Sequence, residues 1–275
     1  MRESWAAGAA GWVAHEAVFD AAFAPLTRAL LAAAELQPGQ QVLDVGCGTG
    51  TLLAAAVAAG AEPVGVDISE PMVAAAQRRV PEATAVLADA QTADLAALPG
   101  APFDRVLSRF GVMFFAGPVA AFANLRAATS PTGRLAVACW RSRAENAMFT
   151  LGVDVLTRRL PPVPESDPDA PGPTSFGNRS RLLEVLGDAG WRDLTVEPFD
   201  FVCDFGTDGS DGVQARLGTV LAGFTGRAAQ ARLEPELGPA GWAALLDEVR
   251  NELRTALVDG VLRFPGAAWL VTAGR

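Results

Sequence analysis

Short apolar runs alternate with stretches of helical spacing along the first half of the chain. The apolar runs have the length of buried strands and cover 42–45, 63–67, 83–88, 103–108 and 134–140. Between them, helices are predicted for the Ala- and Leu-rich run that ends at Gly60, for 69–79 and for 118–128. Strands that alternate with helices predict a parallel sheet with helices on both faces.

The rest of the chain departs from this alternation. Residues 3–36 precede the first strand and show helical spacing from Val13 onward. An apolar helix is predicted over 146–160, and six prolines between 161 and 173 predict a loop. Further helices are predicted over 180–190, 209–223 and 242–257, and further strands over 191–201, 260–264 and 267–273, the last two interrupted by Pro265-Gly266.

A glycine-rich turn joins the first strand to its helix. Gly46, Gly48 and Gly50 follow Asp44 in the pattern D-x-G-x-G-x-G. Glycine lets the backbone turn tightly and approach a ligand closely, so this strand, turn and helix predict a nucleotide-binding unit. The pattern differs from the dinucleotide fingerprint G-x-G-x-x-G, because Thr51 stands at its third glycine, and no Lys follows as in a phosphate-binding loop.

Several segments resemble class I S-adenosylmethionine (SAM)-dependent methyltransferases. The first two are V-L-D-V-G-C-G-T-G (42–50) and V-G-V-D-I-S-E-P-M (64–72), and P-T-G-R-L-A-V-A-C-W (131–140) is similar to a later turn and strand of the family. F-D-R-V-L-S-R-F-G-V-M-F-F (103–115) resembles the subset with ubiquinone/menaquinone-like methyltransferases and small-molecule tailoring enzymes. The resemblance implies an α/β fold with a doubly wound, Rossmann-like seven-stranded sheet in the order 3-2-1-4-5-7-6, its last strand antiparallel.

The same resemblance implies one domain over 1–275 with added segments. These are an N-terminal helical arm or lid at 1–38, a SAM-binding core at 40–140, a lid insertion at 141–178 and a helical cap at 208–259. Two alternatives stay open, because the arm could instead pack against the outside of the sheet and 141–178 could be a plain surface loop.

The resemblance places SAM at the carboxyl ends of the strands, with S-adenosylhomocysteine (SAH) as the product. Asp67 ends the second strand about twenty residues past the glycine turn, where a ribose-binding carboxylate belongs. Asp89 would bind the adenine amino group, although an Asp after a strand is also an ordinary turn residue. The implied cofactor-binding residues are Asp44, Gly46, Cys47, Gly48, Thr49, Gly50, Asp67, Ile68, Met72, Asp89, Ala90, Ser108, Arg109 and Phe110.

Large apolar residues near the same strand ends predict a partly apolar acceptor pocket. We expect some of the candidates to be plain core rather than pocket; they are Trp5, Trp12, Met113, Phe114, Trp140 and Phe176. His15 is the only histidine of the chain, and it would be a general base if the N-terminal arm closed over the site. A surface position on a helix is the alternative for His15.

Composition removes several classes of function. The net charge of -9 argues against nucleic acid as a partner, because phosphate backbones require a basic surface. The chain has no Lys and no Tyr, which excludes lysine Schiff-base enzymes and the Tyr-Lys pair of short-chain dehydrogenases. Its three cysteines form no C-x-x-C motif, so neither a disulfide framework nor a metal site is predicted.

The predicted protein is cytoplasmic, a monomer or homodimer, and acts on a small molecule rather than at a membrane. No apolar signal core is present, and the apolar runs are shorter than the about 18 residues that a membrane span needs. The predicted function is SAM-dependent methyl transfer to O, N or C of a small organic acceptor. A fold reused for cyclisation or rearrangement, and a non-catalytic SAM-binding subunit, are the alternatives.

Overall fold

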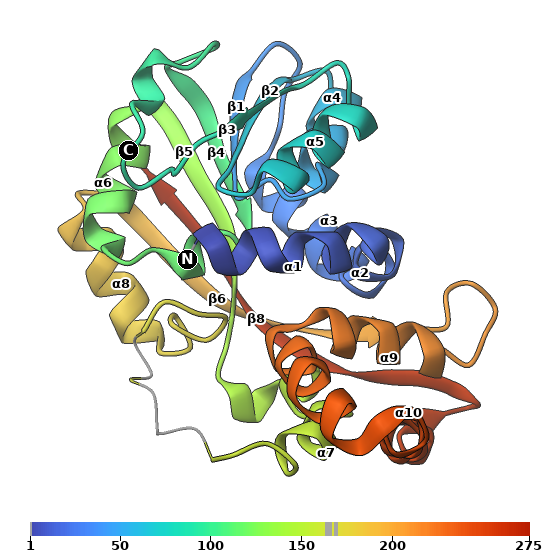
Figure 1. The fold of residues 1–275 in the computed structure, drawn as a ribbon. Helices are drawn as coiled ribbons and strands as arrows, with labels where there is room; N and C mark the ends of the chain where they lie inside the picture. Colours follow the sequence, from blue (N-terminus) through green and yellow to red (C-terminus); the bar gives the residue numbers. More distant parts are fainter. Residues whose placement is uncertain (1, 163–166, 168–169) are drawn as a thin grey trace.

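The computed structural model describes residues 2–162, 167 and 170–275, with side chains from residue 8 onward. One sheet forms the centre of the molecule, with strands in the order β3-β2-β1-β4-β5-β8-β6 and β7 paired to β8 beside this row (Figure 1). The strands are β1 (Gln41–Val45), β2 (Glu62–Asp67), β3 (Thr84–Leu87), β4 (Phe103–Arg109), β5 (Thr129–Trp140), β6 (Arg192–Asp204), β7 (Leu257–Val258) and β8 (Val261–Gly274).

The predicted strand order and direction are confirmed. β1 to β5 pair in parallel, and β8 runs antiparallel to both β5 and β6. β8 takes the place of strand 7 in the predicted order, between β5 and β6, and the additional strand is the two-residue β7, which forms a hairpin with β8.

The predicted interruption of the last strand at Pro265-Gly266 is wrong. β8 runs unbroken through these residues, and Pro265 lies opposite Val202 of β6. The pairing with β5 ends at Ala268, so β8 has a sheet neighbour on one side at Pro265. A proline can occupy such a position, because the N–H that it lacks is not needed on the open side.

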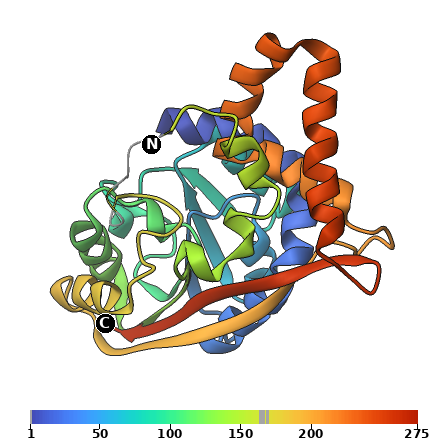
Figure 2. The ribbon, with the colours of Figure 1, turned by 90° about the horizontal axis from the view of Figure 1, so that it is seen from below.

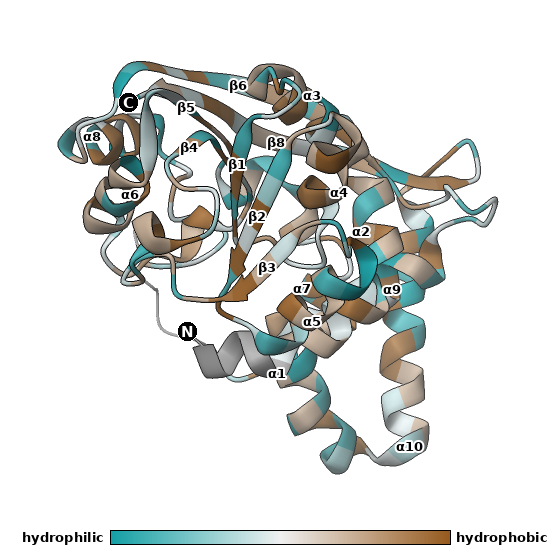
Figure 3. Ribbon diagram, turned by 90° about the horizontal axis from the view of Figure 1, so that it is seen from above, coloured by the Kyte–Doolittle hydropathy of each residue, from teal (hydrophilic) through white to brown (hydrophobic). Residues whose placement is uncertain are grey.

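Helices cover both faces of the sheet, as the alternating pattern predicts. The helices α3 (Ala24–Ala34), α4 (Thr51–Ala58) and α5 (Glu70–Arg79) lie on one face, and α6 (Pro118–Ala127) and α8 (Arg179–Asp188) lie on the other (Figure 1). Two short 3₁₀ helices, η1 (Leu95–Ala97) and η2 (Val112–Phe114), follow β3 and β4. The core lies between these layers, and hydrophobic stretches occur along both the central strands and the helices that cover them (Figure 3).

The N-terminal arm packs against the sheet with its last helix and against α9 (Val213–Ala222) with its first two. It forms α1 (Arg2–Ala14), α2 (Glu16–Ala22) and α3, of which α3 packs against the sheet with Leu26 and Leu30 fully buried. α1 and α2 instead contact α9, on the side of the sheet where the parallel strands end (Figure 1). The division of the chain into arm, core, lid and cap stays a prediction.

The helix predicted over 146–160 is wrong for most of its length. The structure has two 3₁₀ turns, η3 (Arg143–Glu145) and η4 (Ala147–Phe149), and the five-residue α7 (Val153–Thr157). Asn146 is bound to β8, because its side chain accepts a hydrogen bond from Ala267 N (2.8 Å) and donates one to Ala267 O (3.0 Å). Gly152, at φ 78°, then stops the helical path, since this left-handed conformation does not continue a helix.

The region between β6 and β8 holds more helix than predicted. α9 begins at Val213 rather than 209, and α10 (Phe224–Thr255) is much longer than the predicted 242–257. Gly238 has non-helical backbone angles between Pro235 and Pro239, and it divides α10 into two arms that project from the body (Figure 2).

Within the described residues, no single helix is long and apolar enough to cross a membrane. The bent pair Glu16–Ala22 and Ala24–Ala34 meets that test by length and composition alone.

Candidate functional site

A cavity of about 560 Å³ lies at the carboxyl ends of the parallel strands. Residues of the glycine turn line one part of it, which we call the turn side. Phe23, Phe110, Trp140 and Phe149 line another part, which we call the aromatic side. The predicted residues that line the cavity are Trp12, Asp44, Gly46, Cys47, Gly48, Thr49, Asp67, Ile68, Met72, Asp89, Ala90, Arg109, Phe110, Met113, Phe114 and Trp140.

The glycine turn is held against the neighbouring strands by close backbone packing. Gly46 N–H and Cys47 N–H both donate to Val66 O, at 2.8 and 3.1 Å. A Cβ on Gly46 would lie 2.7 Å from Gly111 Cα, and Gly46 also has a φ of +68°. A side chain at this position would therefore displace the loop after β4, which explains why the turn needs glycine here.

Asp67 closes the turn side from the end of β2. Its carboxylate accepts hydrogen bonds from Gly48 N–H and Ser69 N–H, both at 2.9 Å. Burial raises the pKa of Asp67, and these two hydrogen bonds act in the opposite direction. The carboxylate thus links the glycine turn to the start of α5 and still borders the cavity.

Asp44 is buried at the end of β1 without a partner for one of its oxygens. It is 2% exposed, and Oδ1 has no hydrogen bond from any described group. Burial raises the pKa of Asp44 to about 7, and the charge of Arg109 acts in the opposite direction. An unpartnered acidic oxygen beside a cavity favours a ligand that brings a positive charge or a hydrogen-bond donor.

Asp89 lines the cavity and also makes the turn that its sequence position allowed. Its Oδ1 accepts a hydrogen bond from Gln91 N–H at 3.0 Å. Gln91 in turn accepts one from Gly117 N–H through Oε1 (2.8 Å), so the segment after β3 is tied to the start of α6. Met72 is buried, yet it borders the same part of the cavity.

Two predicted cofactor residues do not line the cavity. Ser108 is fully buried, where its hydroxyl donates to Val45 O (2.7 Å) and accepts from Gly111 N–H (3.0 Å). This side chain fixes the loop that packs against the glycine turn. Gly50 has a φ of +89° and lies against Ala76 of α5, so it shapes the turn from behind.

An ionic cluster that the sequence did not reveal ties the N-terminal arm to the turn side. Asp20 of α2 contacts Arg79 (2.7 Å), Arg109 (3.2 Å) and the Thr51 hydroxyl (2.6 Å), which come from three different elements. Burial raises the pKa of Asp20, but the hydrogen bond from Thr51 and the charges of Arg109 and Arg79 lower it overall. Asp20 and Arg109 are 89 positions apart, so no local pattern could have paired them.

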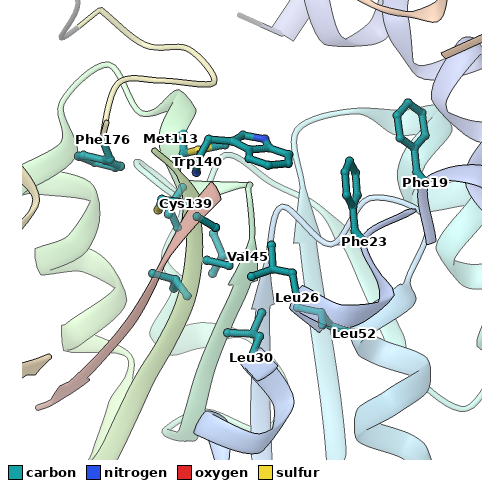
Figure 4. Close-up of a cluster of buried hydrophobic side chains, with 14 of the residues drawn as sticks. Phe19, Phe23, Leu26, Leu30, Val45, Leu52, Met113, Cys139, Trp140 and Phe176 are labelled. Atoms are coloured by element: carbon teal, nitrogen blue, oxygen red, sulfur yellow. The ribbon is translucent and has the colours of Figure 1, made fainter. Parts of the chain in front are cut away.

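Aromatic rings from four separate segments of the chain form the aromatic side. Phe110 and Trp140 are stacked with centroids 4.2 Å apart, and Phe23 meets both rings edge-on at 5.4 and 5.5 Å. Phe149 meets Trp140 edge-on at 5.6 Å. Figure 4 shows Trp140 at the end of its strand, facing Phe23 and Phe19 of the N-terminal arm. The predicted partly apolar pocket is therefore built from ring faces and edges.

Of the predicted pocket residues, Phe176 lies elsewhere. Phe176 is buried against Phe122, on the side of Trp140 away from the N-terminal arm (Figure 4), and it is core rather than pocket. The side chain of Trp5 lies outside the described residues. Trp12, in contrast, is stacked on Phe19 at 3.9 Å, and both line the cavity.

His15 does not line the cavity. Its ring packs on Gly218 of α9, where an added Cβ would lie 2.9 Å from Nε2. The neighbouring Glu16 lines the cavity instead. This placement gives no support to His15 as a base. Among the described residues no three His, Cys, Asp or Glu side chains are grouped closely enough to hold a metal ion.

Comparisons with known proteins agree with this geometry. A family model described as "Methyltransferase domain" matches residues 42–133. The chain is 34% identical over 176 residues to a demethylmenaquinone methyltransferase of Mycolicibacterium paratuberculosis, covering 60% of this chain and 73% of the relative. It is 30% identical over 168 residues to the Renibacterium salmoninarum protein of the same name, covering 58% of this chain and 69% of the relative.

A solved structure shows the same fold. Phosphoethanolamine N-methyltransferase 2 of Haemonchus contortus, in complex with S-adenosyl-L-methionine, matches with a TM-score of 0.50 and 18% identity. The match covers 91% of this chain and 52% of that one, so this chain spans about half the length of that protein. On the strength of the two curated relatives, the chain belongs to the class I SAM-dependent methyltransferase family, whose methyl donor is SAM.

Proposed function

We propose that the chain transfers a methyl group from SAM to a small, partly apolar organic acceptor. One observation carries the proposal: the turn side and the aromatic side are parts of a single cavity. A donor held at the glycine turn and an acceptor held among the rings would share one enclosed space. The names of the two demethylmenaquinone methyltransferases support a small-molecule acceptor.

The residues of the turn side fit SAM. Its ammonium group would supply the donor that Asp44 Oδ1 lacks, and a Cβ on Gly48 would meet nothing within 4 Å, so the turn has open space beside it for a ligand. Asp67 would accept hydrogen bonds from the ribose hydroxyls, with Ile68 and Met72 beside the nucleoside. Asp89 would bind the adenine amino group from the same wall.

The aromatic side supports the acceptor role that we assign to Phe110, Met113, Phe114 and Trp140. SAM supplies a methyl group already activated by its sulfonium, so the protein mainly has to align the acceptor and exclude water. The rings that cover this part of the cavity would do both. Where the acceptor must lose a proton, Glu16 is better placed than His15 because it borders the cavity.

Calorimetric titration with SAM, SAH and NAD tests the donor assignment. We expect SAM and SAH to bind and NAD not to bind, with binding lost in Asp67→Ala. Asp188→Ala is the matched control, because Asp188 is exposed on α8, away from the cavity. Absence of SAM binding to folded protein would contradict the proposal.

Incubation with SAM and a panel of aromatic acceptors then tests the transfer. We expect SAH together with an acceptor whose mass has increased by one methylene. SAM binding without SAH formation on any acceptor would instead favour a fold reused for another reaction.

A further inference from the structure

Arg216 is a buried cation in the wall of the cavity. It comes from α9, is 2% exposed and is among the residues that line the cavity. Its Nη2 donates to Met148 O (2.7 Å) and Leu151 O (2.9 Å), and its Nη1 donates to Thr219 Oγ1 (3.3 Å). These bonds hold the guanidinium next to the aromatic side, because Met148 precedes Phe149 in η4.

Within the part of the chain that the structure describes, Arg216 has no carboxylate partner. Its Nε is buried without a hydrogen bond, and its ionisable neighbour is the thiol of Cys203. Burial raises the pKa of Cys203 to about 12, although the charge of Arg216 acts against this, so the thiol stays neutral. The rings of Phe205 and Phe264 lie 5.7 and 5.5 Å from the guanidinium carbon.

The other cavity-lining arginines of the described chain are paired. Arg109 forms an ion pair with Asp20 at 3.2 Å, and Arg143 forms one with Asp154 at 3.3 Å. Arg216 is buried, and burial lowers its pKa only to about 10, so it remains charged at neutral pH. A buried charge without a counter-ion is costly, which makes such a group a candidate for ligand recognition.

We propose that Arg216 recognises a negative charge on the acceptor, and hence that the acceptor binds as a flat aromatic anion. This inference rests on the proposed function, since it concerns the acceptor half of the same cavity. An anionic oxygen of a carboxylate or a phenolate would satisfy Nε and offset the buried charge. The ring of the acceptor would lie against Phe149 and Trp140.

Matched probes isolate the charge of the acceptor. Protein saturated with SAH is titrated calorimetrically at neutral pH with 2-naphthoate and with 2-naphthamide, which have nearly the same shape and differ in charge. We expect the carboxylate to bind about tenfold or more tightly than the amide. A second pair, 4-nitrophenolate and 4-nitrobenzyl alcohol at alkaline pH, shows whether a phenolate is recognised in preference to a carboxylate.

Substitutions then assign the preference to Arg216. In Arg216→Met the carboxylate and the amide should bind equally, and in Arg216→Lys part of the preference should remain. Arg105→Met is the matched control, because Arg105 also donates to two backbone carbonyls but does not line the cavity. An unchanged preference in Arg216→Met would overturn the proposal.

The outcome for Arg216 can be separated from that for the donor. Loss of SAH binding to the wild type would contradict the proposed function, whereas SAH binding with no anion preference in either probe pair would contradict the role of Arg216 alone. Where Arg216→Met does not fold, Arg216→Lys makes the assignment, and an anion preference as strong in Arg216→Lys as in the wild type would overturn it.

Discussion

Replacing Asp44 by Asn is expected to stabilise the ligand-free protein and to weaken its binding of SAM. Asp44 is buried, one of its oxygens has no partner, and its pKa is raised to about 7 from the ordinary 3.8. Asn has nearly the same shape but carries no charge, so the substitution removes the cost of burying the ionised carboxylate. It also removes the negative charge of Asp44, which we propose to bind the ammonium group of SAM.

The size and sign of the effect follow from the two pKa values. The unfolded chain loses the Asp44 proton near pH 3.8, while the folded protein keeps it until about pH 7. The protonated carboxyl group of Asp44 therefore makes its full contribution to stability below pH 3.8, and this contribution is lost as the pH rises to about 7 and above. A difference of one in pKa corresponds to about 1.36 kcal/mol, so the loss by pH 8 is about 4 kcal/mol.

Urea unfolding of the wild type and Asp44→Asn across pH 4 to 8 measures this difference. We expect similar free energies of unfolding near pH 4 and a gap in favour of Asn that widens to about 4 kcal/mol by pH 8. Asp188→Asn, at an exposed position, controls for the exchange itself. A gap that does not grow with pH would refute the reasoning, because every other titrating group is shared by the two proteins.

Donor binding gives an independent readout of the same carboxyl group. An ammonium beside Asp44 favours its ionised form, so SAH should release a proton when it binds near pH 6. Calorimetry in two buffers of different ionisation enthalpy detects this release, and the release should be absent in Asp44→Asn.

Three further experiments test the packing and burial of individual residues. In Gly111→Ala the new Cβ would lie 2.9 Å from Gly46 Cα, so urea unfolding should show a loss of about 1–3 kcal/mol in the free energy of unfolding. Gly187→Ala, in open space on α8, is the control and should be neutral or stabilising by under about 1 kcal/mol. Asp20→Asn should speed hydrogen exchange in α2 at neutral pH, and the difference should fade as acid protonates the wild-type carboxyl group, whose pKa is lowered. Native protein should react slowly with iodoacetamide, because burial raises the pKa of its thiols at Cys47, Cys139 and Cys203.

Local sequence signals predicted the sheet and the turn side well. The spacing from Asp44 through Gly46 to Asp67 is set by one strand, one turn and one helix, so short-range physics determines where these groups meet. The order of the strands came from the family resemblance and was confirmed. The N-terminal arm was predicted to be helical, but its division into three helices was not.

Local sequence signals could not predict contacts between segments that are far apart in the chain. The helix predicted through Asn146 does not form there, because the Asn146 side chain is hydrogen-bonded to Ala267, which is 121 positions away. Phe176 and Trp140 are both large aromatic residues in apolar surroundings, yet one packs into the core and the other onto Phe110 at the cavity. Arg216 lies in an ordinary helical pattern, and its importance depends on the carbonyl of Met148 from another segment.

Asp44 and Arg216, two buried groups that line the cavity, have opposite charges but do not offset each other. The charges that act on the pKa of Asp44 are those of Arg109 and Asp67, whereas the ionisable neighbour of Arg216 is the neutral thiol of Cys203. Each group therefore bears its own desolvation cost in the ligand-free protein, where neutral side chains would be more stable. The ammonium of the donor would relieve one cost and an anionic acceptor the other, so we infer that each ligand stabilises the fold independently and that the ternary complex gains both contributions.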